Sequence, residues 1–210
     1  MTPRFFTARD RRERIGRRQL LAAGSWTDSV AEIADGLVGL HSSDPATVYL
    51  SAAMRMRKPS VEAVERALYD SRSVVRLHGF RRTMWVMTPR TAASMFASTT
   101  AGHAAALTQR LVSLVEANEI TSDAPAWVEN AKAELLDALS ARGTATTREL
   151  GEACPDTAIA LEVQGVTVTA HSRLMACLGF DGAVVRTRPL GSWISSQYAW
   201  APMDAWVEGG

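Results

Sequence analysis

Residues 74–87, VVRLHGFRRTMWVM, constrain the fold more than any other part of this chain. They are typical of two short β-strands joined by a turn. Four basic side chains lie in this segment: Arg76, His78, Arg81 and Arg82. An amphipathic helical stretch, residues 60–69, comes directly before it. A helix that runs into a basic β-hairpin is the second half of a winged helix-turn-helix, so the sequence predicts this fold.

The residues before this segment predict the three helices that such a unit needs. Ser29 or Asp28 is a good N-cap for the first helix. Asp44 caps the second helix and is followed by Pro45, a residue favoured at the first helical position. Ser60 then caps the third helix. Three helices followed by a hairpin is the order of elements in a winged helix.

The C-terminal half repeats this order. Residues 88–118 predict a helix that links the two halves, and residues 126–142 predict the first helix of a second unit. Thr146 or Thr147 caps the next helix, with Glu149 near its third position. This spacing is familiar at the entry to the second helix of a helix-turn-helix.

The second unit is completed by a recognition helix and a wing. Residues 160–168 predict either an extended piece or a connecting turn. Residues 169–178 predict the recognition helix. The wing strands are expected over residues 183–188 and 193–200.

These elements predict a mainly α fold with small β-hairpins (α+β), built from tandem winged helix-turn-helix units. The chain of 210 residues is long enough for two small domains. We expect residues 1–110 to form the first unit, with a basic N-terminal helix and a linker helix. We expect residues 111–210 to form the second unit, either complete or truncated before a further C-terminal lobe.

The formal net charge of +1 hides an uneven distribution. Residues 1–110 hold 17 Lys and Arg against 9 Asp and Glu, whereas residues 111–210 hold 6 against 13. The N-terminal half is therefore the expected surface for phosphates. Its opening helix, over residues 4–24, contains seven arginines and either lies on a phosphate backbone or is a solvated helix docked by a few leucines. Codon bias explains a preference for Arg over Lys, but not the concentration of charge in one half.

Several protein classes are disfavoured by missing patterns. No apolar run approaches the roughly 20 residues of a membrane span, and the N-terminus lacks the apolar centre of a secretory signal. Cys154 and Cys177 are isolated thiols without metal spacing, as in a reducing cytoplasm. The chain has no P-loop, dinucleotide fingerprint, nucleophile elbow or HExxH motif. We expect a cytoplasmic protein that needs no metal or cofactor and does not bind membranes.

The wings supply the candidate DNA contacts. The three arginines and the histidine of the first hairpin lie close together, which favours phosphate or minor-groove contact over ordinary surface charge. Trp85 is expected to pack this wing onto its helices rather than to stack on a base. The second unit adds four candidate DNA-binding residues: His171, Arg173, Arg186 and Arg188. Acidic surroundings make DNA contact by the second wing a weaker expectation.

One polar cluster lies at an unusual place, the end of an apolar helix. It contains His41, Ser42, Ser43 and Asp44, directly before Pro45. A histidine held close to a carboxylate can orient or activate a water molecule. Helix capping is the alternative interpretation, because a serine and an aspartate before a proline are what a helix start requires.

Three sequence blocks together resemble a known family. They are GLHSSDPATVYLS at residues 39–51, ERALYDSRSVVRLHGFRRTMWVM at residues 65–87 and GSWISSQYAWAP at residues 191–202. They are similar to bacterial winged-helix DNA-binding proteins related to DNA glycosylases that excise bulky alkylated bases and unhook interstrand crosslinks. The resemblance covers nearly all of the chain and implies tandem winged helices with a base-excision site near the first. It also implies that family members continue well beyond Gly210.

The resemblance assigns candidate catalytic residues to the polar cluster. Active relatives carry Gln-x-Gln or Gln-x-Asp just before the Asp-Pro, and His41 and Ser43 occupy those places here. His41 is then the residue that positions or activates a water, Ser43 holds that water, and Asp44 is the nearest carboxylate. The chain is either a divergent DNA repair hydrolase acting on alkylated or crosslinked bases in duplex DNA, or a DNA-binding protein that has lost catalysis. A transcriptional regulator and a protein-docking module are the further alternatives.

Overall fold

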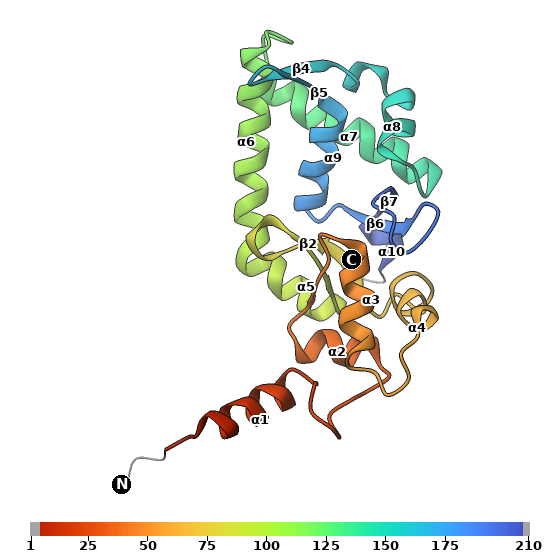
Figure 1. The fold of residues 1–210 in the computed structure, drawn as a ribbon. Helices are drawn as coiled ribbons and strands as arrows, with labels where there is room; N and C mark the ends of the chain where they lie inside the picture. The colour runs from red at the N-terminus through yellow and green to blue at the C-terminus, as the bar shows by residue number, and fades with distance from the viewer. Residues whose placement is uncertain (1–4, 208–210) are drawn as a thin grey trace.

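The computed structural model describes residues 5–207. Figure 1 shows two groups of elements, one around β1, β2 and α3 and the other around α7, α8 and α9. The α6 helix runs beside both groups, and α1 projects away from the first (Figure 1). Within residues 5–207 the fold is mainly helical with three small antiparallel sheets, which confirms the expected α+β class.

The first group contains three capped helices and a sheet. Its elements are α2 (Val30–Gly36), β1 (Leu40–His41), α3 (Pro45–Ala53), α4 (Val61–Glu65) with its π-helical continuation η1 (Arg66–Asp70), β2 (Val75–His78) and β3 (Met84–Met87). Each helix begins where the sequence predicts. The side chains of Ser29, Asp44 and Ser60 each accept a hydrogen bond from a backbone N–H of the first turn.

Strand β1 adds an edge to the predicted hairpin. The sheet has the order β1-β3-β2, and both pairings are antiparallel. Leu40, Val86 and Arg76 lie opposite one another across the three strands, and the next row contains His41, Trp85 and Leu77. Because side chains alternate between the faces of a strand, these two rows point to opposite faces of the sheet.

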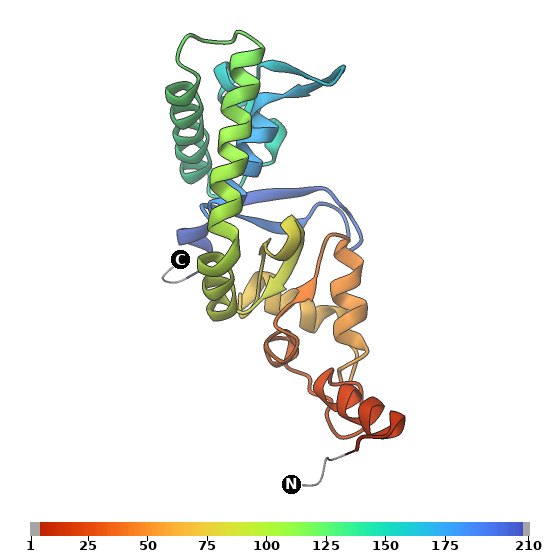
Figure 2. The same cartoon turned by 90° about the vertical axis from the view of Figure 1, so that its left-hand side faces the viewer.

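A continuous helical segment connects the two groups. It consists of α5 (Pro89–Met95), the π-helical η3 (Phe96–Thr100) and α6 (Ala101–Ala117). Figure 2 shows α6 rising from below the first sheet to the far end of the second group. The expected linking helix is thereby confirmed, with a π-helical segment in the middle.

The second group begins with the long helix α7 (Ala124–Arg142). It continues with α8 (Thr147–Ala153), η4 (Pro155–Thr157), β4 (Ala160–Val163), β5 (Val166–Thr169), α9 (Ala170–Phe180), β6 (Val184–Pro189), β7 (Tyr198–Pro202) and α10 (Met203–Trp206). The capping box between Thr146 and Glu149 is present. Residues 160–168 contribute to a hairpin of their own. The final strand starts later than predicted, because residues 190–197 form a long loop.

Apart from the β4–β5 hairpin, which lies between α8 and α9 in the second group alone, the two groups share one order of helices and strands within residues 5–207. In the second group Ala145 forms an isolated antiparallel bridge with Trp200 of β7, and β7 pairs with β6. Ala145 thus lies where β1 lies in the first group, between the first and second helices and beside the last strand. The strand order, first-last-middle, is the same in both.

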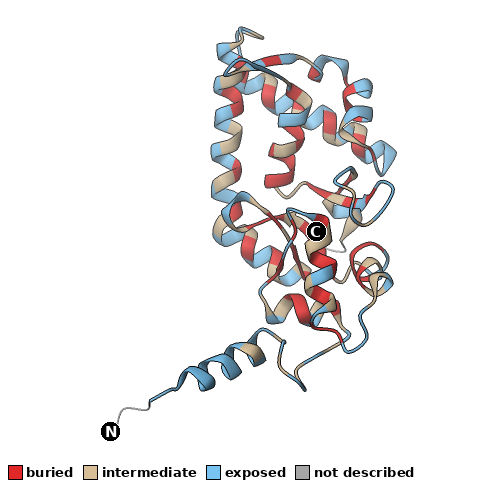
Figure 3. Ribbon diagram, viewed as in Figure 1, coloured by how far each residue is buried: buried red, intermediate tan, exposed pale blue. Residues whose placement is uncertain are grey.

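Each group has its own hydrophobic core. One buried cluster contains residues between Val30 and Val86, and another contains residues between Leu111 and Trp200. Figure 3 shows the buried residues concentrated on the inward sides of the helices of each group, while α1 is mostly exposed. Helix α1 spans Ala8–Arg18 and is shorter than the predicted opening helix. Among the described residues, no helix combines the length and hydropathy that a membrane crossing requires.

Candidate functional site

The polar cluster before α3 is held from both ends. The backbone N–H of Ser42 donates to the carbonyl oxygen of Met84 at 2.8 Å, next to the pairing of β1 with β3. The hydroxyl of Thr47 lies 3.0 Å from the carbonyl oxygen of His41 and 2.6 Å from that of Asp44. Strand and helix therefore fix the backbone of this segment on both sides.

His41 is exposed, and its ring has two neighbours. Its Nε2 lies 3.2 Å from the Oγ of Ser43, which is also exposed. The imidazole meets the ring of Trp85 edge-on, with 5.3 Å between the centroids. An imidazole in contact with solvent and a hydroxyl can hold a water molecule between them and accept a proton from it.

The side chain of Asp44 caps helix α3. Its Oδ1 accepts a hydrogen bond from the backbone N–H of Ala46 at 2.9 Å, in the first turn of α3. The capping interpretation of this residue is therefore confirmed. The carboxylate stabilises the start of the helix that carries the cluster.

Arg76 lies on the opposite face of the sheet from His41 and is only 4% exposed. Its Nη2 donates to the carbonyl oxygen of Ser42 at 2.7 Å, and no carboxylate in residues 5–207 pairs with it. Burial lowers the pKa of Arg76. The expected exposed contact with DNA does not fit this position. Arg76 supports the His41–Ser43 segment from behind.

Ser42 and Arg76 share a small internal cavity with Tyr49. The Oγ of Ser42, the Oη of Tyr49 and the Nε of Arg76 are buried and lack a protein hydrogen-bond partner. All three residues line a cavity of about 10 Å³. A volume of this size holds about one water molecule, and three polar groups are enough to bind it. No local sequence pattern indicates this arrangement.

His78 is also buried, with 8% of its surface exposed. Its ring stacks on Phe180 of α9, with the centroids 4.1 Å apart, and lies against Gly179. Burial is the main reason that the pKa of His78 falls to about 4. The expected DNA contact therefore does not fit His78, because the second group covers this end of β2.

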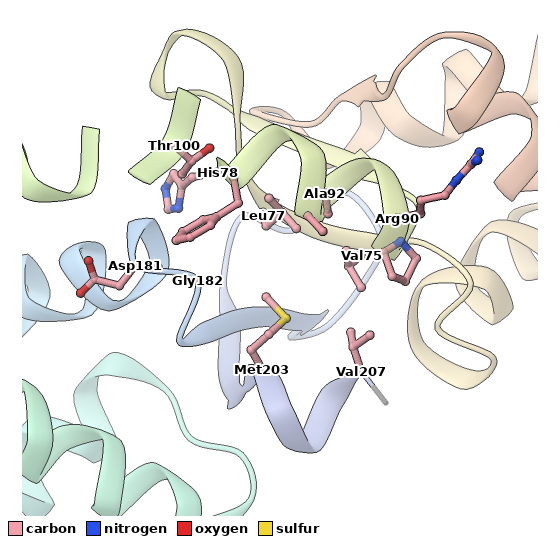
Figure 4. Close-up of a pocket in the computed structure, with 14 residues that line it drawn as sticks. Val75, Leu77, His78, Arg90, Ala92, Thr100, Asp181, Gly182, Met203 and Val207 are labelled. Atoms are coloured by element: carbon pink, nitrogen blue, oxygen red, sulfur yellow. The ribbon is translucent and has the colours of Figure 1, made fainter. Parts of the chain in front are cut away.

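His78 borders a cavity between the two groups, shown in Figure 4. The cavity has a volume of about 490 Å³ and a mainly apolar lining. Val75 and Leu77 line it from β2, and Met203 and Val207 line it from the C-terminal end (Figure 4). It lies along the β2 edge of the sheet, whereas His41 is on the opposite edge strand.

Arg81 and Arg82 are the exposed cations of the first hairpin. They lie in the connection between β2 and β3, and both have positive φ angles, 57° and 60°. Within residues 5–207 neither forms an ion pair. The ring of Phe80 meets Trp85 edge-on at 5.5 Å. A row of three rings, His41, Trp85 and Phe80, thus joins the polar cluster to this basic turn.

The β6–β7 hairpin, predicted from the sequence as the second wing, contacts the first group. The guanidinium of Arg188 lies 2.6 Å from Glu65 and 3.3 Å from Asp70, over the ring of Tyr69. Trp193, in the β6–β7 loop, packs against Tyr49 of α3 with ring centroids 5.0 Å apart. Figure 2 shows the hairpin and its loop reaching over the first group.

Arg186 is the other predicted basic contact of this wing. Its guanidinium lies 3.9 Å from the centroid of the Tyr198 ring, and burial lowers its pKa to about 10. Arg186 and Arg188 are thus both engaged with protein groups, which does not fit their expected role as free DNA contacts. Sequence reasoning could not find the partners of Arg188, because Glu65 and Tyr69 lie more than 100 residues away in the chain.

The two remaining candidates lie on α9. His171 packs its ring against Gly151 of α8, and burial lowers its pKa. Arg173 is exposed, as a DNA contact requires. The structure therefore brings Arg81 and Arg82 near the polar cluster through the aromatic row, but places His171 and Arg173 in the other group. In residues 5–207 no cluster of His, Cys, Asp and Glu has the composition of a metal site.

Comparisons with known proteins concern the family and the fold. The family model described as DNA glycosylase AlkZ-like matches residues 34–209. Among solved structures, the Streptomyces sahachiroi DNA glycosylase AlkZ superposes with a TM-score of 0.61 at 18% sequence identity. The match covers 90% of this chain and 47% of that chain, so this chain spans about half the length of that relative. No curated protein sequence matches significantly. Since the family model covers most of the chain, the protein belongs to the AlkZ-like DNA glycosylase family.

Proposed function

We propose that the protein binds duplex DNA through tandem winged helix-turn-helix units and hydrolyses the N-glycosidic bond of alkylated or crosslinked bases. Family membership supports the choice of reaction. The single observation that carries the proposal is the exposed His41–Ser43 pair, held 3.2 Å apart beside the basic hairpin turn.

The winged-helix assignment rests on the repeated topology. Each group has three helices and a final pair of strands, and a third strand or bridge lies between the first and second helices. The second group also carries the β4–β5 hairpin between its second and third helices. This is the element order of winged helices. We assign residues 1–110 to the first unit and residues 111–210 to the second, as their separate hydrophobic cores suggest.

In the proposed reaction the damaged nucleotide leaves the base stack and reaches His41. The imidazole accepts a proton from a water molecule that the Ser43 hydroxyl helps to hold. The water oxygen bonds to the anomeric carbon while the bond from that carbon to the base breaks. The base leaves with the electron pair of that bond. Asp44 contributes indirectly, because its carboxylate caps the helix that follows.

The basic turn is the proposed grip on the DNA backbone. Arg81 and Arg82 are exposed, have no ion-pair partner in the described part of the chain, and lie next to Phe80 in the aromatic row. Guanidinium groups bind phosphate oxygens through bidentate hydrogen bonds. Arg173 is the candidate for a further backbone contact from the second unit.

Release of an alkylated purine from duplex DNA tests the catalytic role. We expect His41→Ala to reduce the rate at least about 100-fold, the usual contribution of a general base. DNA affinity should stay within about twofold of wild type. His103→Gln is the matched control, because His103 lies on α6 outside the cluster. Equal base release by wild type and His41→Ala would remove His41 from the mechanism.

A second candidate function is DNA binding without catalysis, for example as a transcriptional regulator. The observation that favours it is the chemistry of the cluster: a serine hydroxyl is a poor base, and Asp44 is engaged in capping. This function predicts sequence-selective binding to undamaged DNA. The glycosylase predicts modest binding that is independent of sequence and stronger at lesions. Competition between lesion-containing and undamaged duplexes of several sequences separates the two.

A further inference from the structure

The arginine-rich helix α1 has no role in the proposed site. It spans 11 residues, none of which is buried, and it lies before the region that the family model matches. Figure 3 shows its exposed surface along almost its whole length. Isolated helices shorter than about 12–15 residues are marginal in water, so a helix of this length gains stability from a partner.

Five of the six arginines of α1 fall on two different faces, and Arg12 belongs to neither set. Arg9 and Arg17 form i,i+4 ion pairs with Glu13, at 2.9 and 3.5 Å, on one side of the helix. Arg11, Arg14 and Arg18 follow the spacing i, i+3, i+7, which places them together on another side. All three are exposed, and none has a carboxylate partner within residues 5–207. The first face is therefore only partly neutralised, because one carboxylate serves two guanidinium groups, and the other face is a free cationic row.

The C-terminal end of α1 is fixed to the first group. The Nε of Arg55, at the end of α3, donates to the carbonyl oxygen of Gln19 at 2.8 Å. The Nη1 of Arg55 donates to the carbonyl oxygen of Ser51 at 2.7 Å. Leu20, directly after the helix, packs against the core of the first group. This anchor gives α1 a defined starting point on the protein, from which it extends outward (Figures 1 and 2).

We infer that α1 is a DNA-binding arm that lays Arg11, Arg14 and Arg18 along the phosphate backbone, beyond the duplex segment held by the β2–β3 turn. The inference rests on the proposed function, because it takes duplex DNA as the ligand. Three unpaired guanidinium groups on one helical face match a polyanion with regularly spaced charges. An anionic membrane is the other polyanionic surface, but Ile15 is the sole apolar side chain longer than alanine in α1.

Two double variants of the full chain test the arm. Arg11→Gln with Arg18→Gln removes two charges from the free row, and Arg9→Gln with Arg17→Gln removes two from the paired face. Gln and Arg have similar helix propensities, so both variants keep the helix. The measurement is affinity for an undamaged duplex of about 30 base pairs by fluorescence anisotropy between about 50 and 200 mM salt. Vesicles containing anionic phospholipid are the second probe.

The free-row variant is expected to bind DNA more weakly and to lower the slope of log K against log salt by up to about 1.8, since each lost phosphate contact contributes about 0.9. The paired-face variant is expected to stay near wild type. If wild type and both variants have the same salt slope, or if both variants lose the same DNA affinity, α1 is not a DNA-binding arm. The proposed function is not contradicted by either result. Loss of vesicle binding with unchanged DNA binding assigns α1 to membranes and also overturns it. Failure of the wild type to bind any duplex overturns the arm and the proposed function together.

Discussion

His78 shows how the environment of one residue decides its role. It lies in a basic hairpin, yet the end of its strand is covered by Phe180 and Gly179 of the second group. A histidine in such a place stays neutral at physiological pH, because burial penalises the charged form. Its ring therefore acts as an apolar contact between the two groups.

This burial predicts a pH dependence of stability. The pKa of His78 is about 4 in the folded protein and about 6.5 in the unfolded chain, so the unfolded chain binds the extra proton between these values. His78 therefore leaves stability unchanged above about pH 6.5 and destabilises the fold as the pH falls towards 4. We expect the free energy of unfolding of wild type to fall by about 3 kcal/mol more than that of His78→Gln between pH 7 and pH 4.

Urea unfolding at a series of pH values measures this difference. His103→Gln is a control that removes a histidine elsewhere, and the carboxylates and His171 titrate in all three proteins. Parallel curves for wild type and His78→Gln would show that His78 is not held neutral by the fold.

The place of His41 at a helix entry could be predicted from the sequence, whereas the burial of Arg76 could not. The first depends on neighbouring residues and the second on distant strands. The capping pattern at Asp44-Pro45 fixes the start of α3, so the cluster before it lies at a helix entry whatever surrounds it. The burial of Arg76 depends on β1 joining the sheet and on the second wing covering it. Strand alternation separates two faces, but it does not say which face is covered.

At the scale of elements, the β6–β7 hairpin and its loop bind the first group through side-chain contacts. Arg188 of β6 connects to Glu65 of α4 and to Asp70 at the end of η1. Trp193 packs against α3 from the loop that follows β6. Because Arg186 and Arg188 of this hairpin contact protein groups, they are not free to bind DNA.

Arg188→Gln is expected to lower the free energy of unfolding by about 1 kcal/mol, since partly exposed ion pairs and a cation–π contact each contribute up to about this amount. DNA affinity should not change, because the guanidinium faces protein groups. Urea unfolding of wild type, Arg188→Gln, Glu65→Gln and the double variant measures the coupling energy between Arg188 and Glu65. A fall in DNA affinity as large as that of Arg81→Gln would show that Arg188 contacts DNA instead.

The elements themselves were largely predictable, because their signals are local. Caps at Ser29, Asp44 and Ser60, and the box at Thr146, mark helix starts within four residues of sequence. The start of β7 was missed because residues 190–197 form a loop closed by its own hydrogen bonds, such as that from the Leu190 N–H to the carbonyl oxygen of Gln197 at 2.7 Å. The pairing of Ala145 with Trp200 joins positions 55 residues apart and leaves no local pattern.

For the molecule as a whole, the uneven charge decides where DNA is expected to dock. Residues 1–110 hold 17 Lys and Arg against 9 Asp and Glu, although Arg55, Arg72 and Arg76 bond to carbonyl oxygens of the protein. Exposed cations of this half without an ion pair in residues 5–207 include Arg81 and Arg82 in the β2–β3 turn and the free row of α1. Others lie elsewhere in this half: Arg57, Lys58, Arg66 and Arg110. The second half, with 6 against 13, is expected to repel phosphate and so to orient the duplex of the proposed complex towards the first half.

Removing the charges of the turn tests this orientation. Arg81→Gln with Arg82→Gln keeps two non-glycine residues at the positive φ angles, so the change is one of charge rather than backbone strain. We expect weaker duplex binding and a salt slope lower by up to about 1.8. The matched control is Arg142→Gln with Arg148→Gln, two exposed arginines of the acidic half, which should leave the slope unchanged. Unchanged affinity in the Arg81 and Arg82 variant would favour a protein-docking role for this turn, because a phosphate contact cannot lose two charges without losing salt dependence.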